Sequence, residues 1–131
     1  MLKLLIRVTL VVSITAFLLS SCSPKVEVGN VNLENWKKDR NGCLGLRSND
    51  IEEFRKVKNS LLGKDNQTLI KTFGRPDKVE LTDRSQSFFI YFVDPAPTCG
   101  DAAPNEEILK VLIRLNAVSR VSEVTISHLE P

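Results

Sequence analysis

Few side chains in this sequence of 131 residues could support acid–base chemistry. His128 is the only histidine, and a Ser or Cys nucleophile needs such a base beside it. It lies near the end of a predicted strand, where we expect it at the surface. The adjacent pairs Glu52-Glu53 and Glu106-Glu107 diverge in direction, as solvated charges do. With no phosphate-binding glycine pattern and no cofactor motif, the sequence predicts a protein that is not an enzyme.

The amino terminus has the pattern of an export signal. Lys3 and Arg7 form a short cationic region, and the stretch 8–19 that follows carries no charge. A helix that spans a bilayer needs about 20 apolar residues, so this stretch is too short to do so. We therefore expect residues 1–21 to be a signal peptide that is removed.

The leader ends in Leu-Ser-Ser-Cys, with the cysteine at Cys22. This run resembles the bacterial lipobox, in which one aliphatic and two small residues precede the cysteine that takes a diacylglycerol. The alternative is an ordinary secretory signal followed by a coincidental cysteine. Lipid chains contribute about 0.8 kcal/mol per buried CH₂, so two or three chains hold a small domain on a membrane. We expect lipidation at Cys22, and a tether over 22–31 because Pro24 and Gly29 interrupt it.

Removal of the leader changes the charge balance. The sequence carries 18 Lys and Arg against 16 Asp and Glu, a formal net charge of +2. Lys3 and Arg7 of the leader account for the whole excess, so the mature chain is neutral and no nucleic-acid partner is predicted. About 110 residues remain, which suits one domain, expected over 32–131.

Cys43 and Cys99 are the two cysteines left after lipidation. In a small exported domain such a pair favours a structural disulfide. The alternatives are two buried free thiols or a metal site. A metal site has the least support, because the sequence has one histidine and no CxxC motif.

Helical periodicity comes first along the chain and strand periodicity second. Asn32 is placed to cap a helix over 33–40, and Asp65 to cap another that ends near residue 73. Between them, residues 47–50 introduce a helix to about residue 62, with apolar side chains at spacings of three and four: Ile51, Phe54, Val57 and Leu61.

After Pro76 the apolar period changes to two, as in strands. Strands are expected near 79–81 and over 88–93, 109–115 and 121–129, with a long loop over 94–107. Trp36 and Tyr91 are expected in the core. The sequence therefore predicts an α+β fold, with N-terminal helices packed on one face of an antiparallel meander of three to four strands.

A family resemblance appears over residues 61–64 and 73–77, where Gly74, Arg75 and Pro76 end a helix before aromatic strands. The pattern resembles the SmpA/OmlA family of small outer-membrane lipoproteins, the BamE-like group, whose fold is related to that of β-lactamase inhibitor protein. The resemblance covers roughly residues 33–129. It implies helices on an antiparallel sheet and a non-enzymatic role in outer-membrane protein assembly or envelope maintenance.

The resemblance also implies a location in the cell envelope. Ser23 follows the cysteine, and in enterobacterial sorting the absence of Asp there favours the outer membrane. We therefore expect a lipid-anchored protein at the outer membrane, facing the periplasm.

Two hypotheses for function remain. The first is a module that binds another envelope protein through the open side of the sheet and the 94–107 loop, where Glu106 and Glu107 lie. The second is an envelope small-ligand-binding protein, or an enzyme whose site the sequence does not reveal. A well-filled domain without a deep polar cleft favours the first, and a concave pocket with converging ionisable groups favours the second.

Overall fold

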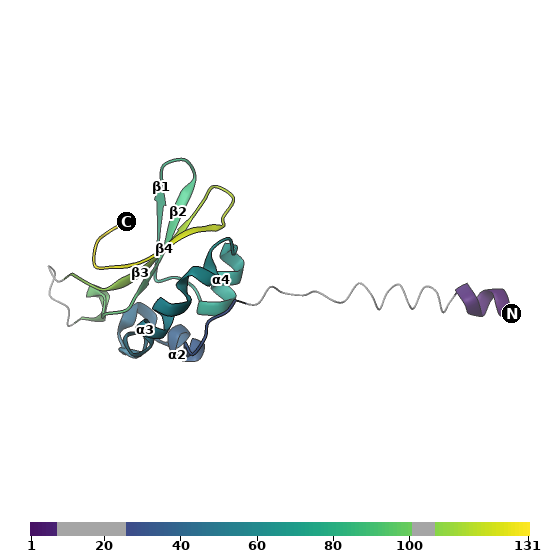
Figure 1. Ribbon diagram of the computed structural model, residues 1–131, viewed down its shortest axis with the longest axis horizontal. Coiled ribbons are helices and arrows are strands. Elements are labelled where there is room, and N and C mark those ends of the chain that lie inside the picture. The colour runs from purple at the N-terminus through teal and green to yellow at the C-terminus, as the bar shows by residue number, and fades with distance from the viewer. Residues whose placement is uncertain (8–25, 101–106) are drawn as a thin grey trace.

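The computed structural model describes residues 1–7, 26–100 and 107–131. The stretch 8–25 holds the uncharged part of the predicted signal peptide and the predicted lipidation site Cys22, and it lies outside the described residues. Within the described ranges, no helix is long and apolar enough to cross a membrane. Figure 1 shows the helices and strands of residues 33–127 packed together in one domain.

Two helices begin at the caps that the sequence predicts. The side chain of Asn32 accepts a hydrogen bond from a first-turn N–H at 3.1 Å, and α2 (Leu33–Lys38) follows. Asp65 accepts from a first-turn N–H at 2.7 Å, and α4 (Asn66–Phe73) follows. Each cap satisfies a backbone donor that the first helical turn leaves without an intrahelical partner.

The middle helix begins earlier than predicted. It is α3 (Leu46–Val57), and it includes the segment 47–50 that was expected to lead into it. Two 3-10 helices flank it: η1 (Arg40–Gly42) and η2 (Lys58–Leu61). The early start depends on the buried Asp39, whose carboxylate accepts from the N–H groups of Leu44 and Arg47 at 2.7 and 2.9 Å. This cap comes from upstream of the helix, so a search for adjacent capping residues does not find it.

Four strands follow and form one antiparallel sheet in the order β1-β2-β3-β4. They are β1 (Lys78–Thr82), β2 (Gln86–Phe92), β3 (Lys110–Leu115) and β4 (Val121–Ser127). The predicted α+β class, with helices before a meander sheet, is confirmed. The last strand ends at Ser127 instead of the predicted residue 129, because the chain bends at His128 and Leu129.

The helices cover one face of the sheet. Alternate residues of a strand point to opposite faces, and Tyr91 pairs with Val111 on the face that packs into the core. Figure 1 shows α2, α3 and α4 gathered on that side of the sheet. The other side carries Phe92, Lys110 and Leu112 and faces away from these helices, so it is here called the open face, although the side chains of Lys110 and Leu112 are buried on it.

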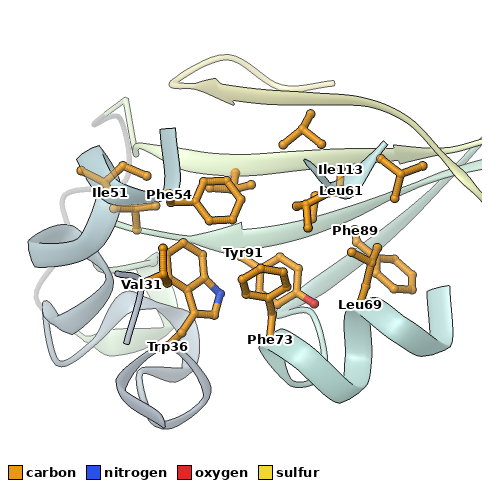
Figure 2. Packing of buried hydrophobic residues seen from close by; sticks show 14 of the residues in the cluster. Val31, Trp36, Ile51, Phe54, Leu61, Leu69, Phe73, Phe89, Tyr91 and Ile113 are labelled. Carbon is orange, nitrogen blue, oxygen red and sulfur yellow. The ribbon is translucent and has the colours of Figure 1, made fainter. Parts of the chain in front are cut away.

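Aromatic rings fill the space between the helices and the sheet (Figure 2). Trp36 stacks on Phe54 with ring centroids 4.9 Å apart, and Phe73 meets Trp36 edge-on at 5.8 Å. The Tyr91 hydroxyl donates to the Gly74 carbonyl at 2.8 Å, so this ring has a polar partner inside the core. Trp36 and Tyr91 are each 1% exposed, which confirms their predicted core positions.

The segment before α2 is part of the domain. Val31 is buried in the core, and Val26 and Val28 pack against it. The prediction that 22–31 is a tether is therefore wrong for its described part, because alternating valines give that part an apolar face to bury. Residues 22–25 lie outside the described residues.

Candidate functional site

A hollow of about 610 Å³ lies on the open face, beside the end of β2 and the start of β3. Its lining comes from segments far apart in the sequence: Asn41, Asp77, Lys78, Phe92, Ala96, Pro97, Thr98, Glu107, Ile108, Lys110, His128 and Glu130. Phe92 and Lys110 are paired across β2 and β3, so the end of the sheet forms part of the lining. Small-molecule sites fall in the range of about 300–1,000 Å³.

Lys110 is a buried cation in this lining, with 3% of its surface exposed. Its ammonium group forms an ion pair with the carboxylate of Glu130, whose own side chain is 70% exposed. The hydrogen bond from Lys110 holds the pKa of the Glu130 carboxyl below its usual range. Lys110 lies on the face of β3 opposite the core, as strand alternation requires, yet its side chain is buried there.

Lys78 is a second cation at the hollow. Its ammonium forms an ion pair with Glu80, and this hydrogen bond is the main reason that the pKa of Lys78 is raised. The Glu130 carboxylate also attracts Lys78 and contributes to the same rise in pKa. Both lysines of the hollow are therefore held in ion pairs by carboxylates of the chain.

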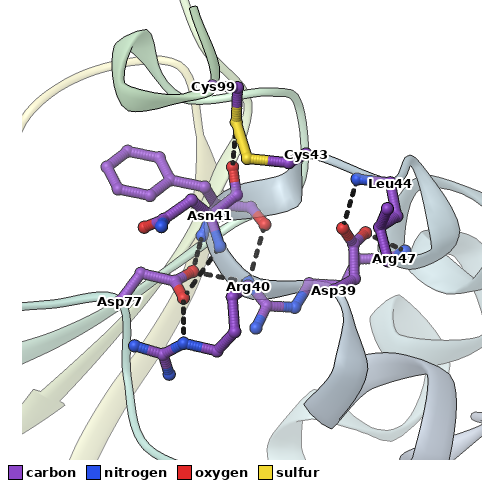
Figure 3. Close-up of a disulfide and its surroundings, with 9 residues drawn as sticks. Asp39, Arg40, Asn41, Cys43, Leu44, Arg47, Asp77 and Cys99 are labelled. Carbon is purple, nitrogen blue, oxygen red and sulfur yellow. Dashed lines mark hydrogen bonds and ion pairs between the residues drawn. A yellow bond between two sulfur atoms is a disulfide. The ribbon is translucent and has the colours of Figure 1, made fainter.

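Asp77 connects the hollow to the interior (Figure 3). Its fully buried carboxylate accepts from the backbone N–H groups of Asn41 and Phe92 at 3.0 and 2.9 Å. It also pairs with Arg47 at 2.5 Å and with the half-exposed Arg40 at 3.6 Å. One side chain thus joins η1, α3 and the end of β2 beneath the hollow.

Arg47 is a buried guanidinium that sequence analysis did not identify as a structural centre. Its Nε donates to the Trp36 carbonyl and its Nη1 to the Phe92 carbonyl, both at 2.9 Å. The guanidinium carbon lies 5.5 Å from the ring centroids of both Trp36 and Tyr91, within the range of cation–π attraction. No local pattern could reveal this role, because Arg47 sits among other polar residues at the start of a helix.

The predicted disulfide is present between Cys43 and Cys99 (Figure 3), with Cα atoms 5.5 Å apart. Cys99 belongs to the 3-10 helix η3 (Pro97–Cys99), which lies in the loop between β2 and β3. Beside the bond, the Ala96 N–H donates to the Asn41 carbonyl at 2.9 Å. The disulfide therefore fastens the 96–99 wall of the hollow to η1.

The other candidate residues do not converge on an acid–base pair. His128 is exposed at the hollow, and its Nδ1 lies 3.2 Å from the Glu107 carbonyl oxygen. Glu52 and Glu53 form ion pairs on α3 with basic residues three positions further on. Glu106 lies outside the described residues.

No cluster of three or more His, Cys, Asp or Glu side chains suited to a metal ion occurs in residues 1–7, 26–100 and 107–131. Comparison of the chain with family models, curated proteins and solved structures finds no match in any of the three. The hollow and the sequence motifs are therefore the features of this chain that bear on its function.

The open face has features of both functions that the sequence left open, a protein-interaction surface and a ligand site. It is concave and several ionisable groups line it, which is the shape expected of a ligand site. Four of these groups are held in ion pairs within the chain: Asp77, Lys78, Lys110 and Glu130.

Proposed function

We propose that this chain is the precursor of a lipid-anchored envelope protein. Its domain is a non-enzymatic module that binds another envelope protein. The hollow on the open face is its contact surface. On the basis of the BamE-like resemblance, we place it at the periplasmic side of the outer membrane. Its role there is in outer-membrane protein assembly or envelope maintenance.

The observation that carries the proposal is the hollow on the open face. The helices bury one face, and the other face offers a hollow whose apolar residues, Phe92, Ile108 and Pro97, lie among paired charges. Protein interfaces likewise combine apolar contact area with polar and charged groups. A surface built in this way supports recognition of another protein.

The predicted lipid anchor supports the same proposal. A domain held to a membrane at Cys22 meets partners on that membrane at a raised effective concentration. A modest contact surface is then sufficient for association, because much of the loss of translational freedom is already incurred by anchoring.

Site-specific photo-crosslinking in intact membranes tests the proposal. A photo-crosslinking amino acid at Thr98, exposed at the hollow, should yield a protein adduct of defined mass. The matched control is the same residue at Lys71, exposed on α4 on the helical side, which should not yield it. Equal adducts from both positions, or none from Thr98, would contradict the proposal.

The volume of the hollow favours a second candidate, an envelope small-ligand-binding protein. Mass spectrometry of the purified full chain, released from detergent under denaturing conditions, separates the two. A small molecule that co-purifies with the wild type and is lost from Phe92→Ala would favour this second candidate.

A further inference from the structure

The two residues of the Lys110–Glu130 ion pair differ greatly in exposure. The lysine is part of a central strand and its side chain is 4% exposed, whereas the side chain of Glu130 is 70% exposed. The cation is thus a fixed part of the hollow, and the anion reaches it from an exposed irregular segment after β4. Within the described part of the chain, Glu130 is the ion-pair partner of Lys110.

A buried ammonium needs an anionic partner, because an uncompensated buried charge is strongly unfavourable. It does not matter to that balance whether the carboxylate comes from this chain or from another. Exchange of one carboxylate for another leaves the Lys110 charge paired throughout, so it avoids the penalty that normally opposes opening a buried ion pair.

The residues around Lys110 favour a particular kind of carboxylate ligand. Lys78 also attracts the carboxylate that Glu130 places here, so the anion experiences two cations. Phe92 and Ile108 line the same hollow and offer apolar contact beside the charged group. A carboxylate next to an apolar side chain on an extended segment matches this arrangement.

We infer that Lys110 is the receptor cation of a carboxylate-binding site in the hollow, which Glu130 fills from within the chain and an acidic side chain of a partner polypeptide fills in the complex. The inference rests on the proposed function and adds the chemistry of the partner. Glu130 acts as an internal competitor, so the apparent affinity for the partner is the intrinsic affinity multiplied by the fraction of time that Glu130 leaves the site free.

Fluorescence anisotropy with a labelled Leu-Glu-Leu peptide and the detergent-solubilised full chain tests this inference. Glu130→Gln removes the internal competitor and should tighten binding about tenfold. In that background, Lys110→Met should abolish binding and Lys110→Arg should retain it. With both peptides amidated at the C-terminus so that neither carries a terminal carboxylate, a Leu-Gln-Leu peptide should bind to none of these proteins.

Glu123→Gln is the matched control, because Glu123 is an exposed carboxylate that pairs at 3.7 Å with Arg114 of the same strand as Lys110. It should leave peptide binding unchanged. Circular dichroism confirms that each variant is folded before it is compared. Equal binding by the wild type and Glu130→Gln, or unchanged binding after loss of the Lys110 charge, overturns the inference.

The outcome is separable from that of the proposed function. Crosslinking from Thr98 without any peptide binding would retain the interaction module and remove the carboxylate site. Free acetate or decanoate that binds Glu130→Gln in place of the peptide would also overturn the polypeptide partner and indicate a small acid.

Discussion

At the scale of single residues, the domain depends on a charge that it buries. The Arg47 guanidinium and the Asp77 carboxylate are both fully buried, and backbone groups supply further hydrogen bonds to each, although Nη2 of Arg47 has no hydrogen-bond partner within the described residues. Such a pair is favourable only while both members are present, because either one alone is an uncompensated charge in a low dielectric.

Asp77→Ala should therefore lower the free energy of unfolding by about 3–5 kcal/mol, measured by urea denaturation of the disulfide-intact chain. The control is Glu52→Ala, which breaks an exposed pair with Arg55 and should change stability by less than about 1 kcal/mol. Similar small effects from both substitutions would show that Asp77 is not a structural centre.

Glu130 gives a prediction for pH. Lys110 lowers the carboxyl pKa from its usual value of 4.5 in the folded state, so the unfolded chain binds this proton more readily. The stabilisation is present above pH 4.5 and is lost as the pH falls through the lower folded-state pKa. Urea midpoints of the wild type and Glu130→Gln should therefore differ at neutral pH and converge in acid. A difference that stays constant with pH would contradict this account.

At the scale of elements, the contact between η1 and the β2–β3 loop is close enough to require glycine. Gly42 has a φ of +67°, and a Cβ at that position would lie 2.5 Å from the Asp94 carbonyl oxygen. Such a contact is backbone against backbone, so no side-chain rotation relieves it.

Gly42→Ala should lower the free energy of unfolding by about 2–4 kcal/mol, as the sum of backbone strain and the clash. Gly45 is the matched control, with a φ of +71° and no atom within 4 Å of the added Cβ. Gly45→Ala should therefore show the strain alone, about 1–2 kcal/mol. Equal losses in the two urea titrations would mean that the Asp94 contact has no effect.

The disulfide acts on the same pair of elements. Cys43 and Cys99 are 56 residues apart, and closing a loop of this length stabilises the folded state by about 4 kcal/mol in the chain-entropy model. The double variant Cys43→Ser/Cys99→Ser should lose about that much free energy of unfolding, measured as a lower midpoint in urea denaturation. Quantitative alkylation of both thiols in unreduced wild type would refute the bond itself.

At the scale of the whole molecule, the prediction concerns the anchor. If Cys22 carries the lipid, Cys22→Ala should lose both fatty-acid labelling and membrane retention, because the acyl chains supply the attachment. Fractionation and metabolic labelling of wild type and variant measure both properties. The control is Cys43→Ser/Cys99→Ser, which should keep the label. Wild type that is unlabelled and released into the soluble fraction would rule out the lipidated precursor.

The order and the class of the helices and strands can be predicted from local patterns in the sequence. Asn32 and Asp65 are local caps, and the change of apolar period after Pro76 separates helices from strands within a few residues. The disulfide was also predictable, because only Cys43 and Cys99 remained to pair once Cys22 was assigned to lipidation. These features depend on residues that are close together along the chain, or on the number of cysteines available to pair.

The residues of the site come together only when the chain folds. Arg47 meets Asp77 across 30 residues, and Lys110 meets Glu130 across 20, so neither pair leaves a local pattern in the sequence. Strand alternation assigned Lys110 to the polar side but could not show that it would be buried there. Burial, and with it the hollow, arises when separate elements pack together, and the low dielectric of that packing makes each charge depend on its distant partner.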